Sequence, residues 1–98
     1  MVTVSVLFTI DISPSHSLKE KRGVVRPLVE RLRTRLHVTA AEVGLQERVD
    51  AAQVGFAAVS GDAATARAVA EDARRFVEDY LIGRGEIIDA AMEETVLR

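Results

Sequence analysis

The 98-residue sequence predicts an α+β fold whose elements follow in the order βαββαβ. Two patterns carry this prediction. Apolar residues recur at every second position in segments typical of strands, and at every third or fourth position in two longer segments typical of helices. Right-handed crossovers in both halves of such a chain give the ferredoxin-like arrangement, a four-stranded antiparallel sheet with two helices on one face. The length suits one domain, so we expect a single domain over residues 1–98.

The first predicted strand covers residues 2–12, where alternation is most regular. Its other face carries Thr3, Ser5 and Thr9, and Leu7 is the one exception to the pattern. The segment Ser13-Pro14-Ser15-His16 then ends the strand, because proline fixes φ and serine favours turns. The face predicted to be buried consists of Val2, Val4, Val6, Phe8, Ile10 and Ile12.

The first predicted helix begins after Ser17 and runs from Leu18 to about Leu36. Ser17 and Glu20 have the spacing of a capping box, in which each side chain binds the backbone N–H of the other residue. Pro27 lies inside the helix, and we expect a bend there rather than a break, because the apolar stripe continues in phase. That stripe consists of Leu18, Val25, Leu28, Val29, Leu32 and Leu36.

The remaining elements complete the βαββαβ order. A short strand is predicted over residues 38–43, and a strand with two apolar faces over residues 52–59. A helix follows Asp62 and ends at Gly83, and a last strand covers residues 87–97. In the last strand, Glu94 falls outside the apolar pattern that is formed by Ile88, Ala90, Met92 and Val96.

The composition excludes several classes of function. The chain has no cysteine, which removes thiolate catalysis and cysteine metal sites, and its two histidines lack metal-ligand spacing. We therefore predict no metal and no cofactor. No nucleophile with a base and no carboxylate pair is recognisable, so an enzyme is the least favoured class. The apolar start of the chain has no basic leader and is interrupted by Asp11, which predicts a cytoplasmic protein without a membrane span.

Charge is distributed unevenly, although the formal net charge is only −2. Residues 1–37 hold seven basic and three acidic residues, a balance of +4, and residues 61–98 hold five basic and nine acidic residues, a balance of −4. Arg31 and Arg35 lie on one flank of the first helix, and Lys21 lies near its apolar stripe and needs a partner. The opposite flank carries a stripe of Lys19, Arg22, Arg26 and Arg33.

This helix is the candidate binding site. Cations near a helix N-terminus oppose the helix dipole, and a bound anion would relieve that conflict. The alternative is an ordinary solvated face, or ion pairs with the second helix through Glu71, Asp72, Glu78 and Asp79. The residues predicted to bind an anion or an acidic partner are His16, Ser17, Lys19, Lys21, Arg22, Arg26 and Arg33.

The face of the sheet without helices is predicted to bind a second subunit. Leu7, Ala57 and Val59 place apolar side chains on it, and such faces are commonly covered. We therefore expect a homodimer through this face. Edge pairing through the second or the last strand is the other route.

A further signal is the run HSLKEKRGVV at residues 16–25, followed by Leu28, Leu32 and Arg33. Together with Ala41-Glu42-Val43 and Val54-Gly55-Phe56, it resembles the YlxP-like family of small bacterial proteins. That family has a ferredoxin-like fold and no established activity, and its genes often lie near those for initiation factor two and ribosome-binding factor A.

The resemblance implies a role in translation or ribosome assembly by association only. Combined with the basic helix, it predicts a non-catalytic binding protein that contacts RNA phosphate or an acidic protein surface. The alternatives are a dimeric regulatory domain for a small ligand and a structural interaction protein.

Overall fold

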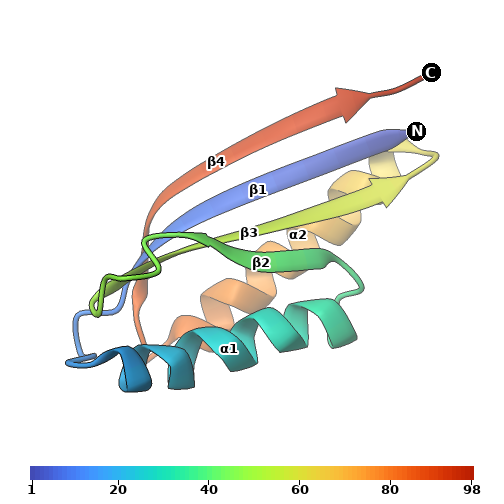
Figure 1. Ribbon diagram of the computed structural model, residues 1–98. Coiled ribbons are helices and arrows are strands. Elements are labelled where there is room, and N and C mark those ends of the chain that lie inside the picture. Colours follow the sequence, from blue (N-terminus) through green and yellow to red (C-terminus); the bar gives the residue numbers. More distant parts are fainter.

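A computed structural model describes all residues, 1–98, and confirms the predicted order of elements (Figure 1). The strands form one sheet in the order β2-β3-β1-β4, and every neighbouring pair is antiparallel. Both helices lie on the same face of the sheet, so the ferredoxin-like prediction is confirmed. The elements are β1 (Val2–Asp11), α1 (Leu18–Arg35), β2 (Thr39–Gly44), β3 (Ala51–Ser60), α2 (Ala63–Leu81) and β4 (Glu86–Val96).

The core lies between the helices and the two central strands, β1 and β3. The β1 positions predicted to be buried are buried, and Val6 stands opposite Phe56 of β3 in the ladder. The rings of Phe8 and Phe56 pack edge to face with their centroids 5.7 Å apart. The two aromatic side chains of the sheet are therefore in the core, and the open face of the sheet has none.

Helix α1 begins with the predicted cap. Ser17 Oγ accepts a hydrogen bond from the Glu20 N–H at 3.1 Å, and the Glu20 carboxylate accepts one from the His16 N–H at 2.8 Å. The helix continues through Pro27 without a break. It ends at Arg35, Leu36 is its C-cap, and the next residue, His37, adopts a left-handed φ of 57°.

Tyr80 links the two helices. Its hydroxyl donates to the Val24 carbonyl oxygen of α1 at 2.7 Å, and its ring lies under the guanidinium groups of Arg31 and Arg84. Arg31 is thereby engaged on the flank of α1 that faces α2. No helix combines the length and apolar character needed to cross a membrane.

Strand β4 corrects one prediction. A bulge separates the pair Thr9–Asp89 from the pair Ile10–Ile87, so Ile88 is the extra residue. Ile87, not Ile88, then lies on the helix-facing side and packs against the core, whereas Ile88 is exposed. Beyond the bulge the helix-facing residues are Ala90, Met92, Glu94 and Val96, as their partners in β1 show.

Gly85 is required where the chain leaves α2 and enters β4. A Cβ atom at this position would lie 2.6 Å from the carbonyl oxygen of Asp11, which belongs to the backbone of β1 and cannot rotate away. Gly83 has a left-handed φ of 77° and ends the helix as predicted.

We predict that Gly85→Ala lowers the free energy of unfolding by about 2 kcal/mol, because the added methyl group must displace backbone. Gly61→Ala is the matched control, since a Cβ atom there meets no atom within 4 Å and φ is not positive. Urea denaturation of both variants measures the difference. Equal stabilities for the two variants would contradict this account of Gly85.

Candidate functional site

Lys21 of α1 is buried, with only 2% of its surface exposed. Its ammonium group donates to the Leu45 carbonyl oxygen at 2.7 Å and to the Gln46 carbonyl oxygen at 3.4 Å. It also lies 3.0 Å from Glu42 Oε2 of β2, an oxygen that is buried and accepts no hydrogen bond of good geometry. The contact with Glu42 is therefore an ion pair, and the two carbonyl groups complete the coordination of the ammonium.

This arrangement corrects the prediction that Lys21 belongs to a surface anion site. Lys21 near the apolar stripe does have partners, but they are Glu42 of β2 and carbonyl groups of the β2–β3 loop rather than a ligand. Leu45 adopts a left-handed φ of 58°, which points its carbonyl group toward α1. A bulge between Glu42 and Gly44 directly precedes this loop.

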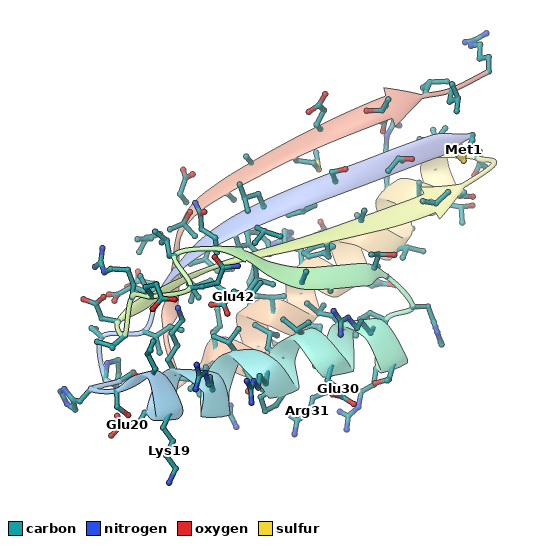
Figure 2. All side chains as sticks on the ribbon, in the orientation of Figure 1. Met1, Lys19, Glu20, Glu30, Arg31 and Glu42 are labelled. Carbon is teal, nitrogen blue, oxygen red and sulfur yellow. The ribbon has the colours of Figure 1, made fainter.

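The predicted basic stripe lies on the surface beside β2. Lys19, Arg22 and Arg26 are exposed and form no ion pair. Figure 2 shows Lys19 pointing away from the sheet at the start of α1, and Glu42 between α1 and β2. Arg33 differs from the others, because its Nε donates to the Ala40 carbonyl oxygen of β2 at 2.8 Å.

A groove follows the line between α1 and β2. It consists of two adjoining hollows of about 260 and 210 Å³, and Val25, Arg26 and Glu42 line both of them. The first hollow, toward the end of the helix, is completed by Val29, Glu30 and Arg33. The second hollow, at its start, is completed by Leu18, Lys21, Arg22, Gln46 and Glu47.

The start of α1 has little room for a further anion, because Glu20 already occupies it. Ser17 Oγ is used to cap the helix, and the Glu20 carboxylate accepts from the His16 N–H. The imidazole of His16 is exposed. The structure thus brings Arg22, Arg26 and Arg33 together along the groove, and leaves Ser17 and Lys21 in internal contacts.

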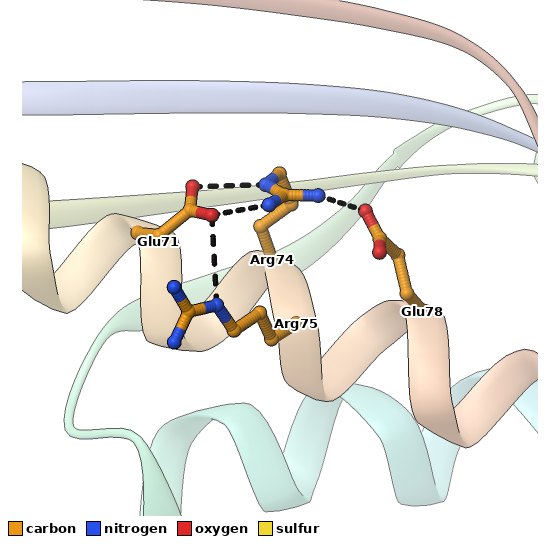
Figure 3. Close-up of polar contacts among 4 residues, drawn as sticks. All are labelled: Glu71, Arg74, Arg75 and Glu78. Atoms are coloured by element: carbon orange, nitrogen blue, oxygen red, sulfur yellow. Dashed lines mark hydrogen bonds and ion pairs between the residues drawn. The ribbon is translucent and has the colours of Figure 1, made fainter.

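In the second helix, Arg74 and Arg75 pair with glutamates of the same helix, as Figure 3 shows. The Arg74 guanidinium contacts both Glu71 and Glu78, and Arg75 Nε lies 3.6 Å from Glu71 Oε1. The predicted alternative, ion pairs between the α1 cations and the acids of α2, is wrong, because no such pair forms. Hydrogen bonds from Arg74 lower the pKa of Glu71 and raise that of Arg74 itself.

One ion pair joins α2 to the sheet edge. Arg67 donates to both carboxylate oxygens of Glu94 in β4, at 2.6 and 2.8 Å. These hydrogen bonds lower the pKa of Glu94 and raise that of Arg67. At the start of α2, hydrogen bonds from the side chain and the backbone of Thr65 lower the pKa of Asp62, which caps the helix.

The open face of the sheet holds a shallow groove of about 520 Å³. Leu7 and Ala57, two of the residues predicted to form a dimer face, line it, and Val59 lies outside it on β3 with 62% of its surface exposed. Val43, whose side chain lies over Gly55, also lines it. No group of three or more His, Cys, Asp or Glu side chains is placed to hold a metal ion.

Two contacts of the site were not predicted from the sequence. Neither the bond from Arg33 to Ala40 nor the pair of Lys21 with Glu42 has a local signal, because both join residues from different elements. The one indication in the sequence is that Lys21 lies near the apolar stripe of α1, where a lysine needs a buried partner.

Residues 3–92 match a family described as "Protein of unknown function (DUF503)". No curated protein matches the chain.

Among solved structures, the chain is similar to a C-terminal segment of the alpha subunit of aIF2 from Pyrococcus abyssi, with 14% identity and a TM-score of 0.55. That alignment covers 98% of this chain and 51% of the other, so the chain spans about half the length of that segment. A de novo designed protein, Foldit4, is 14% identical over 98% of this chain and 99% of its own, with a TM-score of 0.47. The likeness to the aIF2 segment concerns the fold alone.

We predict that Lys21→Met lowers the free energy of unfolding by about 3 kcal/mol, because it leaves the buried Glu42 oxygen and two carbonyl groups without their cation. Lys19→Met is the matched control and changes stability by less than about 0.5 kcal/mol, since Lys19 is exposed. Urea denaturation measures both. The double variant Lys21→Met/Glu42→Gln recovers part of the lost free energy of unfolding. An unchanged free energy of unfolding for Lys21→Met would contradict the role of this contact.

We also predict that stability falls as the pH is lowered through the acidic range. The pKa values of Asp62, Glu71 and Glu94 are depressed in the folded protein, so their stabilisation is present above their unfolded pKa values, near 4, and is lost as the pH falls through the lower folded values. Thermal unfolding between pH 6 and pH 2, monitored by circular dichroism, measures this. Glu94→Gln shows a smaller decrease of Tm than the native chain, and identical decreases would exclude a contribution from Glu94.

Proposed function

The chain belongs to the DUF503 family of proteins of unknown function, and we propose that it is a non-catalytic binding protein whose α1–β2 surface binds the phosphate groups of RNA. The observation that carries this proposal is the contrast between the two helices. Arginine side chains of α2 are paired with carboxylates of α2 or β4, whereas Lys19, Arg22 and Arg26 of α1 are exposed without an ion pair. Unpaired cations in one stripe favour a polyanionic ligand.

The spacing of the stripe supports a ligand with several phosphate groups. Lys19 and Arg33 are fourteen positions apart in one helix, which corresponds to about 21 Å along the axis. Arginine binds phosphate with a planar fork of donors, and Arg22 and Arg26 project from successive turns. Arg33 keeps guanidinium donors free beyond the one bonded to Ala40.

The mode of binding follows from the aromatic residues. Proteins that read RNA bases from a sheet stack them on exposed rings, but Phe8 and Phe56 are buried here. The proposed contacts are therefore to the backbone, without strong sequence specificity.

The run HSLKEKR at residues 16–22 supports the narrower assignment to the YlxP-like proteins. The gene neighbourhood of those proteins, near initiation factor two and ribosome-binding factor A, supports a translation or ribosome-assembly role in the cytoplasm. On this proposal the partner is ribosomal RNA or an RNA-containing assembly.

We predict that the native chain binds a fluorescently labelled single-stranded RNA of 20 nucleotides, with an affinity that falls steeply with salt. Four phosphate contacts correspond to a slope of about −3 in a plot of log affinity against log salt concentration. Fluorescence anisotropy between 50 and 200 mM salt measures this slope. Arg22→Glu/Arg26→Glu weakens binding at 50 mM by at least about tenfold.

The control is Arg35→Glu/Arg75→Glu, which changes the net charge equally but leaves the stripe intact. Arg35 lies on the opposite flank of α1, and Arg75 lies on α2. A loss of affinity confined to the first variant supports the proposal. Equal effects of the two variants, or no binding by the native chain at 50 mM salt, would reject the proposed RNA surface.

A further inference from the structure

The two edge strands of the sheet, β2 and β4, differ in how well they are protected against pairing with a further strand. The β2 edge is short, has a bulge between Glu42 and Gly44, and is bonded by Arg33 at Ala40. The β4 edge has eleven residues, and every one of them except Ile87 is exposed. Its bulge lies near one end, at Ile88, and the residues beyond it contain no proline, lysine or arginine, so the only charges on this edge are carboxylates.

The apolar residues of β4 are also exposed on the side that faces the helices. Met92 has 72% of its surface exposed and Val96 has 52%, although their partners in β1, Val6 and Val2, are buried. Helix α2 stops short of covering them, and a hollow of about 330 Å³ remains between α2 and β4, lined by Ala70, Ala90 and Met92 among others. The edge therefore offers both unpaired backbone groups and uncovered apolar surface.

We propose that two copies of this chain pair through antiparallel β4 strands, about a two-fold axis at Met92, to form one continuous eight-stranded sheet. A symmetric antiparallel pair of strands requires an axis perpendicular to the sheet, which keeps the helices of both copies on one face. The axis passes between the two copies of one central residue, so this residue lies directly opposite its counterpart in the other strand. Every residue before the centre lies opposite the residue of the other strand that is equally far after the centre.

Among centres that keep at least seven residues of β4 paired, which are residues 89–93, the acidic residues select Met92, because carboxylates placed directly opposite each other are unfavourable. A centre at Asp89, Glu93 or Glu94 places that residue opposite itself. A centre at Ala90 places Glu86 opposite Glu94, and a centre at Ala91 places Asp89 opposite Glu93. A centre at Met92 avoids all of these conflicts, with the pairs Met92–Met92, Ala91–Glu93, Ala90–Glu94 and Asp89–Thr95.

The paired segment is long enough for a specific contact. Residues 89–95 lie beyond the bulge and keep a regular ladder with β1. Seven residue pairs give about 6 to 8 main-chain hydrogen bonds, which lies within the range of ordinary protein interfaces. The two Met92 side chains then pack against each other in the space beside α2. The predicted dimer face at Leu7, Ala57 and Val59 has no comparable feature that sets a register.

Cysteine cross-linking tests the register directly, because the native chain has no cysteine. Under mild oxidation, Met92→Cys forms a disulfide-linked dimer, since directly opposed residues have Cα atoms about 4.5–5.5 Å apart, within the range that a disulfide spans. Val59→Cys tests pairing through the open face, and Ile82→Cys, equally exposed at the end of α2, reports random collisions. Cross-linking of Met92→Cys well above both controls supports the proposal, and preferential cross-linking of Val59→Cys overturns it.

Sedimentation equilibrium gives an independent measurement. The native chain is a dimer at micromolar concentration, and Met92→Glu raises its dissociation constant by at least about tenfold, because two carboxylates then meet at the axis. Val59→Glu leaves the dissociation constant unchanged. A monomeric native chain at 100 μM, or a dimer dissociated by Val59→Glu and not by Met92→Glu, overturns the proposal. Circular dichroism confirms that both variants fold, since both positions are exposed.

Discussion

The buried ammonium group of Lys21 is the contact on which the α1–β2 side of the molecule depends. It joins the first turns of α1 to Glu42 in β2 and to two carbonyl groups of the loop that leads to β3. Removing an ammonium from water is costly, and this cost is offset only when its donors and its charge are satisfied together. The left-handed conformation of Leu45 and the bulge before Gly44 shape the loop that achieves this. The position of β2, and hence of the groove, follows from this cluster.

The cations of α1 fall into two groups, those that make contacts within the molecule and those that do not. Lys21 is used inside the molecule, and Arg31 and Arg33 are partly used to hold Tyr80 and Ala40. Lys19, Arg22 and Arg26 have no such contacts, so their charge is available to a ligand. In α2, Arg74 and Arg75 lie at helical spacing from Glu71 and Glu78 and pair with them locally (Figure 3). A near-neutral total charge thus conceals one helix with unpaired cations.

The parts of the structure that the sequence predicted are those determined by local patterns. Alternation predicted the buried face of β1, the spacing of Ser17 and Glu20 predicted the helix cap, and Gly83 predicted the end of α2. The parts that were not predicted depend on residues far apart in the chain. Glu42, the ion-pair partner of Lys21, is 21 residues away. The bulge in β4, which turns Ile87 rather than Ile88 toward the core, depends on pairing with β1. A periodic pattern contains no information about such a one-residue insertion, because the shift becomes visible only against the neighbouring strand.

The two proposals place different surfaces at opposite ends of the sheet. Helix α1 lies beside β2, the edge strand farthest from β4, so pairing through β4 leaves both basic stripes exposed (Figure 1). Seven strand spacings separate the two copies of β2, which puts the stripes roughly 30 Å apart on one side of the assembly. One polyanion long enough to reach both would bind two weak sites at once, and its avidity would exceed the affinity of either. On these proposals, weak and sequence-independent contacts on each helix together suffice for attachment to a large RNA, whereas an oligonucleotide too short to span both stripes would contact only one.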